Sequence, residues 1–369
     1  MKSSLIFTFS RSYNFGASLQ AFSLQRAIRM LGSECKIIDT RSDEEIKGHI
    51  EYRKDIKGRI LNIFTYLNRK KILKGKESFN SFNYSCKDRL RLPAIKGVPE
   101  VKKIEAMGQL ADVYIVGSDQ VFSPMMMSKL YFLQFNTWKA KCISYAASIG
   151  ISEIPKDKEK IMKKYLEKFD TVSVREESGK VALQPFINKE IQVHLDPTLL
   201  TEKENWEREE KEYAPLAGKK YILAYFLYRP ADMNKQLRNI HKETGLPIIL
   251  IDTSAFRNIY HQNIVLDAGP QEFLWLIHHA EMIITSSFHG TVMSIIYGKP
   301  FVVYNNPATP ARIEQLLNLT GLQKHWIKNG TKLKRSDFDV SEREIETAYR
   351  LIEKEKEKSL NYLYEWLCD

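Results

Sequence analysis

Short apolar runs separated by longer amphipathic stretches recur along the whole chain. In the first half, the stretch 17–31 repeats apolar residues at helical spacing and stops at Gly32, which predicts a helix. Continuous apolar runs bounded by turn residues are typical of strands that helices cover on both faces. The strands expected in this half occupy residues 5–9, 35–39, 113–116, 142–147, 171–174 and 191–195.

The same alternation restarts after a mostly charged segment that contains Pro215 and Gly218. Strands are expected over 221–227, 248–252, 282–285 and 301–304, and helices over 270–279, 291–297, 313–317 and 341–367. This alternation predicts an α/β fold with two Rossmann-like, doubly wound domains and a working cleft between them. The predicted parts are an N-terminal domain (1–200), a linker (201–218), a C-terminal domain (219–340) and a terminal helix (341–369).

Size and composition fit this architecture. A chain of 369 residues usually exceeds one hydrophobic core, and 43% hydrophobic with 27% charged residues is ordinary for a globular protein. No stretch approaches the roughly 18 apolar residues of a membrane span, and the first apolar run is too short for a signal peptide. The four cysteines lack the spacing of a zinc site or disulfide framework, so reduced thiols and a cytoplasmic location are expected.

The net charge of +11 is unevenly distributed. The segment 56–76 holds seven Lys and Arg residues and no acid, with apolar residues at helical spacing, which predicts one basic amphipathic helix. Two interpretations stay open: a core-facing helix with a solvated basic back, or contact with an anionic membrane or a lipid-linked phosphate. Nucleic acid is not expected as a partner, because no groove-reading motif or basic aromatic sheet accompanies the segment.

Ligands of such folds bind at the carboxyl ends of the strands, which directs attention to the turns there. After the first strand, Asn14 and Gly16 precede a helix whose free N–H groups suit an anion or a hydroxyl, although a plain tight turn is an alternative. After the strand 113–116, Asp119 suits a general base or a sugar-hydroxyl contact. Helix capping is the alternative for Ser118 and Asp119.

Further charged residues follow other strands. Arg175 comes directly after the strand 171–174, where a guanidinium can grip phosphate or carboxylate with two parallel bonds. The alternative is surface pairing with Glu176 or Glu177. Arg312 opens a helix and suits anion binding or surface pairing equally. Glu272 is either a first-turn charge that complements a helix dipole or a ligand contact.

The strongest signal is the turn 285–291, where a buried strand passes into a helix. Ser286 and Ser287 offer hydroxyls, and His289 can donate a proton or bind phosphate. A structural core histidine is the alternative. His278 and His279 fall inside an expected helix and are interpreted as packing or surface residues. No motif for a metal or a nucleotide cofactor is present, so neither is expected.

Together these segments resemble the polysaccharide pyruvyl transferase family over nearly the whole chain. The resemblance implies a fold similar to GT-B glycosyltransferases, with an acceptor-side N-terminal domain, a donor-side C-terminal domain and a terminal helix that crosses back. Each motif is weak alone, and their order and spacing make the resemblance specific. The motifs are residues 14–20, 116–121, 144–148, 174–178, 195–198, 269–273 and 286–290.

The resemblance also implies an activity. Phosphoenolpyruvate would give its three-carbon unit to two hydroxyls of one sugar, forming a pyruvate ketal and releasing phosphate. Arg175 and His289 match the donor-binding residues of the family, and Arg312 matches a position that is basic in relatives. One departure concerns Ser287, because many members carry an arginine there. Arg312 or Lys299 would then supply the missing charge, or the donor differs.

The leading hypothesis is therefore a transferase acting on a cell-surface saccharide, lipid-linked at the inner face of the membrane. Phosphate binding and proton donation are assigned to His289, anion binding to Arg175 and Arg312, and the acceptor hydroxyl to Asp119. Two rival hypotheses remain. One is a GT-B glycosyltransferase that binds a nucleotide sugar near 269–272, and the other is a non-catalytic saccharide-binding homologue.

Overall fold

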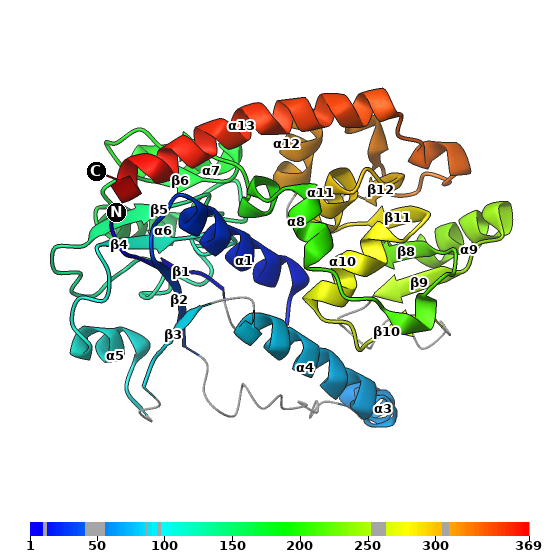
Figure 1. Cartoon of the computed structure of the whole chain (residues 1–369), viewed down its shortest axis with the longest axis horizontal. Helices are drawn as coiled ribbons and strands as arrows, with labels where there is room; N and C mark the ends of the chain where they lie inside the picture. Colours follow the sequence, from blue (N-terminus) through cyan, green and yellow to red (C-terminus); the bar gives the residue numbers. More distant parts are fainter. Residues whose placement is uncertain are drawn as a thin grey trace.

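Two parallel β-sheets organise the computed structural model, which describes residues 1–9, 13–40, 56–85, 88–93, 97–251, 263–304 and 310–368 (Figure 1). The first sheet has the order β3-β2-β1-β4-β5 and the second the order β10-β9-β8-β11-β12-β13. The first contains β1 (Ser4–Phe7), β2 (Cys35–Asp39), β3 (Arg89–Arg91), β4 (Val113–Val116) and β5 (Lys141–Ser144). The second contains β8 (Ile222–Tyr225), β9 (Ile248–Ile251), β10 (Ile264–Val265), β11 (Met282–Thr285), β12 (Phe301–Tyr304) and β13 (Trp326–Ile327).

Both sheets have a point where the strand order reverses. β1 pairs with both β2 and β4, and β8 pairs with both β9 and β11, always in parallel. Chain connections then leave in opposite directions from the central strand, which opens a crevice at the carboxyl ends of the strands. A small parallel pair, β6 (Ser173–Val174) and β7 (Gln192–Val193), continues the first sheet beside β5 through single bridges.

Helices fill the space between and around the sheets. One hydrophobic cluster includes Phe15 and Phe22 from the first half and Tyr225 and Phe273 from the second, so the two halves share a core. Phe15 and Phe273 stack with ring centroids 4.4 Å apart. The helices are α1 (Phe15–Met30), α3 (Ile56–Leu67), α4 (Arg69–Ser85), α5 (Glu100–Ala106), α6 (Lys156–Leu166), α7 (Glu177–Leu183), α8 (Lys203–Arg208), α9 (Met233–Thr244), α10 (Pro270–His278), α11 (Phe288–Ile296), α12 (Pro310–Thr320) and α13 (Glu342–Cys368).

The last helix, α13, runs along both halves of the molecule (Figure 1). Near its end, the Tyr362 hydroxyl donates to the Ser144 carbonyl at 2.8 Å. The amide of Lys2 donates to the Leu367 carbonyl at 3.1 Å. These bonds fasten the end of the chain to the first sheet. Among the described helices, none is long and apolar enough to cross a membrane.

The charged segment 201–218 is packed and partly helical. It contains α8, and the fully buried Trp206 in this helix donates from Nε1 to the Thr198 carbonyl at 3.2 Å. The polar composition of the segment gives no indication of this buried side chain.

The segment 56–76 differs from the expected single helix. α3 ends at Leu67 and α4 begins at Arg69, so the chain breaks at Asn68, a residue type that favours turns over helix interiors. Of the two interpretations left open for this segment, the core-facing one fails at Leu67, which is 73% exposed, and Ile63 nearby is 61% exposed. The side chains of residues 56–61 lie outside the described ones.

Other expected elements shift at their ends. α11 starts at Phe288 and not at Thr291, because Ser287 caps it by accepting from the Gly290 amide at 3.3 Å. Three short edge strands, β3, β10 and β13, were not expected, since two or three residues leave no periodic signal. Residue 252, at the end of an expected strand, lies outside the described residues.

Candidate functional site

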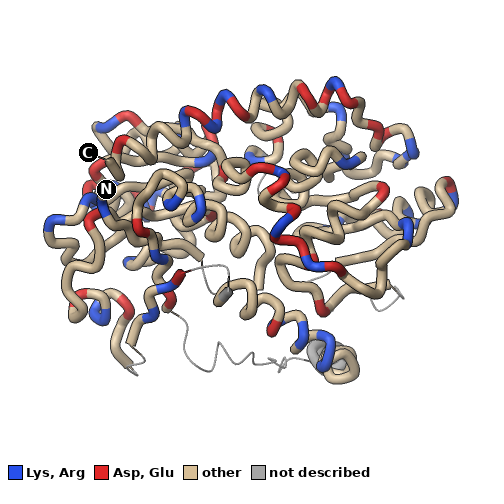
Figure 2. Tube along the Cα trace, in the orientation of Figure 1, with Lys and Arg blue, Asp and Glu red and all other residues tan. Residues whose placement is uncertain are grey.

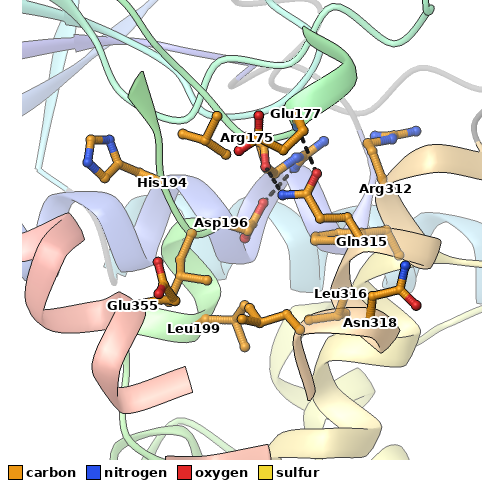
Figure 3. A pocket seen from close by; sticks show the side chains of 14 residues that line it. Arg175, Glu177, His194, Asp196, Leu199, Arg312, Gln315, Leu316, Asn318 and Glu355 are labelled. Carbon is orange, nitrogen blue, oxygen red and sulfur yellow. Dashed lines mark hydrogen bonds and ion pairs between the residues drawn. The ribbon is translucent and has the colours of Figure 1, made fainter. Parts of the chain in front are cut away.

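Arg175 and Asp196 form a buried pair where β6 and β7 end. Arg175 Nη1 lies 2.5 Å from Asp196 Oδ2, and both side chains are at most 3% exposed (Figure 3). The guanidinium also lies 3.6 Å from the Glu176 carboxylate and 4.7 Å from the centre of the Phe288 ring. Burial lowers the Arg175 pKa, but the charges of Asp196 and Glu176 outweigh it and raise that pKa overall. The cation is therefore permanent.

Asp196 connects this pair to His289. Its Oδ1 accepts from the Thr198 amide at 3.0 Å and from the Thr198 hydroxyl at 2.6 Å. Its Oδ2 lies 3.5 Å from His289 Nε2. Burial alone would raise the Asp196 pKa, but His289, Arg175 and the Thr198 hydroxyl hold it far below its usual range. A fixed carboxylate thus orients an arginine from one half and a histidine from the other.

His289 lies in the first turn of α11, directly against the beginning of α1. A Cβ atom added to Gly16 would lie 2.0 Å from His289 Nδ1, so only glycine allows α1 to approach the imidazole this closely. His289 Nε2 is buried and has no hydrogen-bond partner among the described residues. Gly16 and His289, which were predicted separately as site residues, therefore meet in the structure, although they come from different halves.

Arg312 lies beside Arg175 on a cavity of about 330 Å³ (Figure 3). Burial, followed by the like charge of Arg175, lowers the Arg312 pKa to about 10. Among the described residues, the buried Nε and Nη2 of Arg175 and Nε of Arg312 have no hydrogen-bond partner. Two cations that repel each other and carry unpaired N–H groups make a site for an anion.

The cavity crosses the boundary between the halves. Gln315 Oε1 accepts from the Glu177 amide at 2.8 Å, and its Nε2 donates to the Arg175 carbonyl at 3.3 Å. These bonds hold α12 against the turn that carries Arg175. Other residues that line the cavity include Val193, His194, Asp196, Leu199, Phe288, Leu316, Asn318 and Glu355. His289 and Asp119 are not among the lining residues.

The surface-pairing interpretation of Arg175 is wrong, because its partner Glu176 is only 2% exposed. Glu176 accepts from the Ser148 hydroxyl at 2.5 Å, which fixes the carboxylate under the arginine. Asp119 contributes charge near both Arg175 and Arg312. Helix capping by Asp119 is also wrong, since no helix follows it and its φ is 69°.

Four other predicted site residues have local structural partners. Asn14 caps α1 by accepting from the Ala17 amide at 3.1 Å, and Ser287 caps α11. The Ser286 hydroxyl donates to the Tyr228 carbonyl at 2.5 Å. Glu272 accepts from the Gly269 amide and pairs with Lys211, both at 2.9 Å. Their side chains therefore help to shape the turns, and Glu272 lies in the first turn of α10.

Ser118 and Lys299 have different positions relative to the cluster. Ser118 Oγ donates to the Ala146 carbonyl at 2.9 Å and lies 3.5 Å from Asp196 Oδ2, at the edge of the cluster. Lys299 precedes β12 and interacts with Glu281 and Lys203, at the opposite end of the strands. Of the two candidates for the missing family charge, only Arg312 lies beside Arg175.

Three residues at the site were given no functional role from the sequence: Asp196, Glu176 and Gln315. The first two do lie within the family motifs 195–198 and 174–178. Asp196 follows an expected strand and precedes Pro197, so its position at a strand end was the available signal. Gln315 sits inside a helix, where its side chain carries no distinguishing pattern.

Comparisons with known proteins show the fold and the family of this chain. The HepE protein of Anabaena, in complex with UDP and glucose, has a TM-score of 0.57 at 9% identity over 99% of this chain and 98% of that one. UDP-GlcNAc 2-epimerase from Methanocaldococcus jannaschii has a TM-score of 0.52 at 15% identity, over 94% and 91%. These likenesses confirm the expected GT-B-like pair of Rossmann-like domains. No curated protein sequence matches the chain. The family model of polysaccharide pyruvyl transferase matches residues 14–307, so the chain belongs to this family of enzymes.

Proposed function

We propose that this enzyme transfers the pyruvyl group of phosphoenolpyruvate to two hydroxyls of one sugar and releases phosphate. The supporting observation is the pair of guanidinium groups, Arg175 and Arg312, on one cavity with N–H groups that lack partners. Phosphoenolpyruvate carries a phosphate and a carboxylate, and each suits a guanidinium fork. An anion between the two arginines would also relieve their repulsion, which adds to the effect of burial in lowering the Arg312 pKa.

The reaction needs a proton donor and a base. His289 protonates the methylene carbon of the donor, and a sugar hydroxyl adds to the neighbouring carbon. The bond from that carbon to the phosphate oxygen then breaks, phosphate leaves, and the second hydroxyl closes the ketal ring. Of the two hydroxyl protons, one returns to His289 and one leaves with phosphate. Asp119 takes the proton of the attacking hydroxyl first and passes it to the departing phosphate, so its carboxylate is regenerated, and the proton of the second hydroxyl restores His289.

The acceptor in this proposal is a cell-surface saccharide on a lipid carrier. The supporting observation is the elbow between α3 and α4, where Ile63, Tyr66 and Leu67 are at least 55% exposed. Arg69, Lys70 and Lys71 follow at once, and Figure 2 shows blue segments gathered where α4 begins. Apolar side chains next to cations suit the interface of an anionic bilayer.

A nucleotide-sugar donor has less support at the expected place. A Cβ atom at Gly269 would lie 2.5 Å from the Ser78 side chain, so α4 covers the beginning of α10. The Gly269 amide is also bonded to Glu272. A helix beginning that is covered and capped offers few N–H groups to a pyrophosphate.

A phosphate-release assay tests the proposal. The enzyme receives phosphoenolpyruvate with bacterial cell-surface saccharide precursors, and in parallel UDP-sugars with the same acceptors. We expect acceptor-dependent phosphate release from phosphoenolpyruvate and a product heavier by one pyruvyl unit. Arg312→Gln should abolish saturable donor binding, whereas Arg335→Gln, on the exposed η5 turn (Arg335–Phe338), should not. Turnover of a UDP-sugar, or donor binding unaffected by Arg312→Gln, would overturn the proposal.

A further inference from the structure

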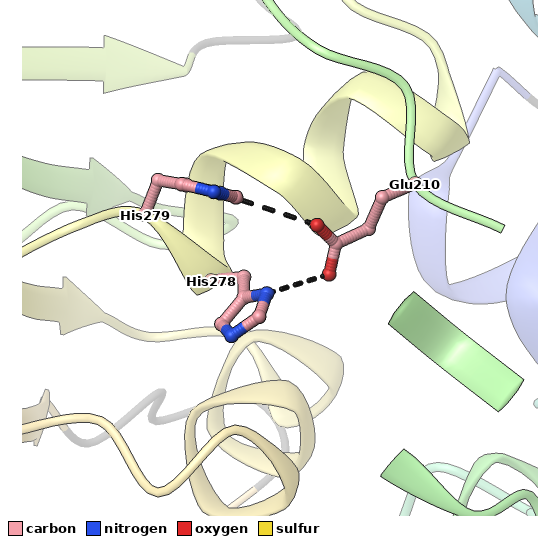
Figure 4. A group of neighbouring side chains, drawn as sticks. All are labelled: Glu210, His278 and His279. Atoms are coloured by element: carbon pink, nitrogen blue, oxygen red, sulfur yellow. Dashed lines mark hydrogen bonds and ion pairs between the residues drawn. The ribbon is translucent and has the colours of Figure 1, made fainter. Parts of the chain in front are cut away.

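A second group of polar side chains lies outside the cavity, where the segment after α8 meets the end of α10. Among the described residues, Glu210, His278 and His279 bring ligand atoms within 4.8 Å of one another. His278 Nδ1 lies 2.9 Å from Glu210 Oε1, and His279 Nδ1 lies 4.0 Å from Glu210 Oε2. Figure 4 shows both imidazoles directed at this one carboxylate.

The chemistry of these side chains selects one class of ion. Two imidazoles and a carboxylate are ligands that zinc and its neighbours in the first transition row prefer, whereas Mg²⁺ and Ca²⁺ prefer oxygen alone. A second carboxylate, on Glu207, lies 3.7 Å from His278 Nε2. His278 is the last residue of α10, and the negative end of a helix dipole also favours a cation.

Tyr297 closes one side of this group. Its ring stacks on His278 with centroids 4.5 Å apart, and the residue is 4% exposed. Its buried hydroxyl interacts with the Glu210 carboxylate. Tyr297 therefore contacts two of the three side chains and holds them in place.

The site is accessible and needs little rearrangement. The His279 side chain is 46% exposed and that of His278 28%, whereas that of Glu210 is only 9% exposed. His279 Nδ1 is 3.0 Å from the Trp275 carbonyl, but that carbonyl also accepts from the backbone amide of His279 at 2.9 Å. Turning the imidazole toward an ion therefore leaves the carbonyl bonded.

We propose that Glu210, His278 and His279 bind one divalent transition-metal ion of the zinc class. The ion would fasten the segment that connects the two halves to α10, which itself packs against α1 and α4. This role is structural, and it does not depend on the reaction proposed for the cavity.

Calorimetric titration of tag-free, chelator-treated enzyme with ZnCl₂ tests the site. We expect one Zn²⁺ per chain and a melting temperature that rises with Zn²⁺ but not with Mg²⁺. Loss of an outer-shell partner alone usually weakens metal binding about 10–100-fold, so Glu210→Gln and His279→Gln should each cost at least about tenfold. The matched control, His241→Gln on the exposed face of α9, should bind Zn²⁺ normally.

The His279 side chain is half exposed, so His279→Gln should fold normally. This variant therefore tests metal binding even if Glu210→Gln proves unstable. Crystals soaked in ZnCl₂ should show anomalous density between the three side chains. Absence of saturable Zn²⁺ binding, or binding that both Glu210→Gln and His279→Gln leave unchanged, would overturn the proposal.

Discussion

The molecule presents cations in two contrasting settings, the cavity and the elbow between α3 and α4. In the cavity, Arg175 is 5% exposed and paired with Asp196, and Arg312 lies beside it. At the elbow, Arg69, Lys70 and Lys71 are exposed and follow exposed apolar side chains. The formal charges are alike. Burial holds the cavity arginines in one geometry, whereas the exposed cations of the elbow remain hydrated and free to move.

This difference decides what each region can recognise. Buried charges have lost their hydration, so a small anion that fits their fixed N–H groups is bound strongly and selectively. Exposed charges are screened within about 8 Å at physiological salt and gain little from any single contact. They suit a broad anionic surface, where many weak attractions add together.

The largest expected effect is on turnover, at His289, which Asp196 connects to the arginine of the cavity. His289→Gln keeps the bulk against Gly16 but cannot protonate carbon, so we expect phosphate release to fall by about 10²–10⁴-fold. His289→Ala should lose at least as much. Thermal melting checks that each variant is folded. A folded His289→Gln enzyme with near-normal turnover would leave His289 as a structural partner of Asp196 only.

The second-largest effect is on how the free energy of unfolding depends on pH, through the buried His194 of the cavity. Burial lowers the His194 pKa from 6.5 to about 4, so the unfolded chain binds more protons between these values. The free energy of unfolding should therefore fall by about 3 kcal/mol from this histidine as pH drops from 6.5 to 4. Denaturant titrations at several pH values should show a shallower slope for His194→Gln. Equal slopes would mean that His194 is protonated in the folded state.

Donor binding provides the third contrast. Arg175→Lys keeps the charge and loses the planar fork, so the affinity for phosphoenolpyruvate should fall about tenfold or more, or about 1.5–3 kcal/mol. Arg335→Lys, at an exposed pair with Asp339, should change it little. Isothermal titration measures both. If Arg175→Ala binds the donor as well as wild type, Arg175 has only a structural role.

The smallest effect on stability is expected at the elbow. The same change should weaken binding to anionic membranes. Changing Arg69, Lys70 and Lys71 to Gln should alter the free energy of unfolding by less than about 0.5 kcal/mol. Binding to anionic vesicles should weaken, because each cation near such a surface contributes about 1 kcal/mol, and should fall further with salt. Lys74 is kept, since it pairs with Asp267 at 3.0 Å.

Vesicle co-sedimentation at low and high salt measures this effect. The matched control changes Lys156, Lys160 and Lys163 on α6 to Gln, which removes the same charge from a helix that also carries acids. If both triple variants lose the same amount of vesicle binding, the net charge of the protein determines this binding and the elbow does not. No dependence on anionic lipid at low salt would remove the membrane from the proposal.

The sequence by itself determined the fold class and the position of most strands and helices. Apolar runs and helical spacing are local properties, and a parallel α/β fold places them in a predictable order. Arg175 and His289 could be singled out for the same reason, because each follows a buried strand. The burial of Trp206 gave no such signal, since it depends on neighbours outside its own segment.

Only the tertiary structure decided which of these residues meet. Asp196 joins an arginine and a histidine that lie 114 residues apart, and Gly16 packs on that same histidine from the other half. Glu210 and His278 are 68 residues apart. No local pattern encodes such contacts, because they arise where the carboxyl ends of two sheets and the helices between them pack together, and a side chain's neighbours, burial and charge follow from that packing.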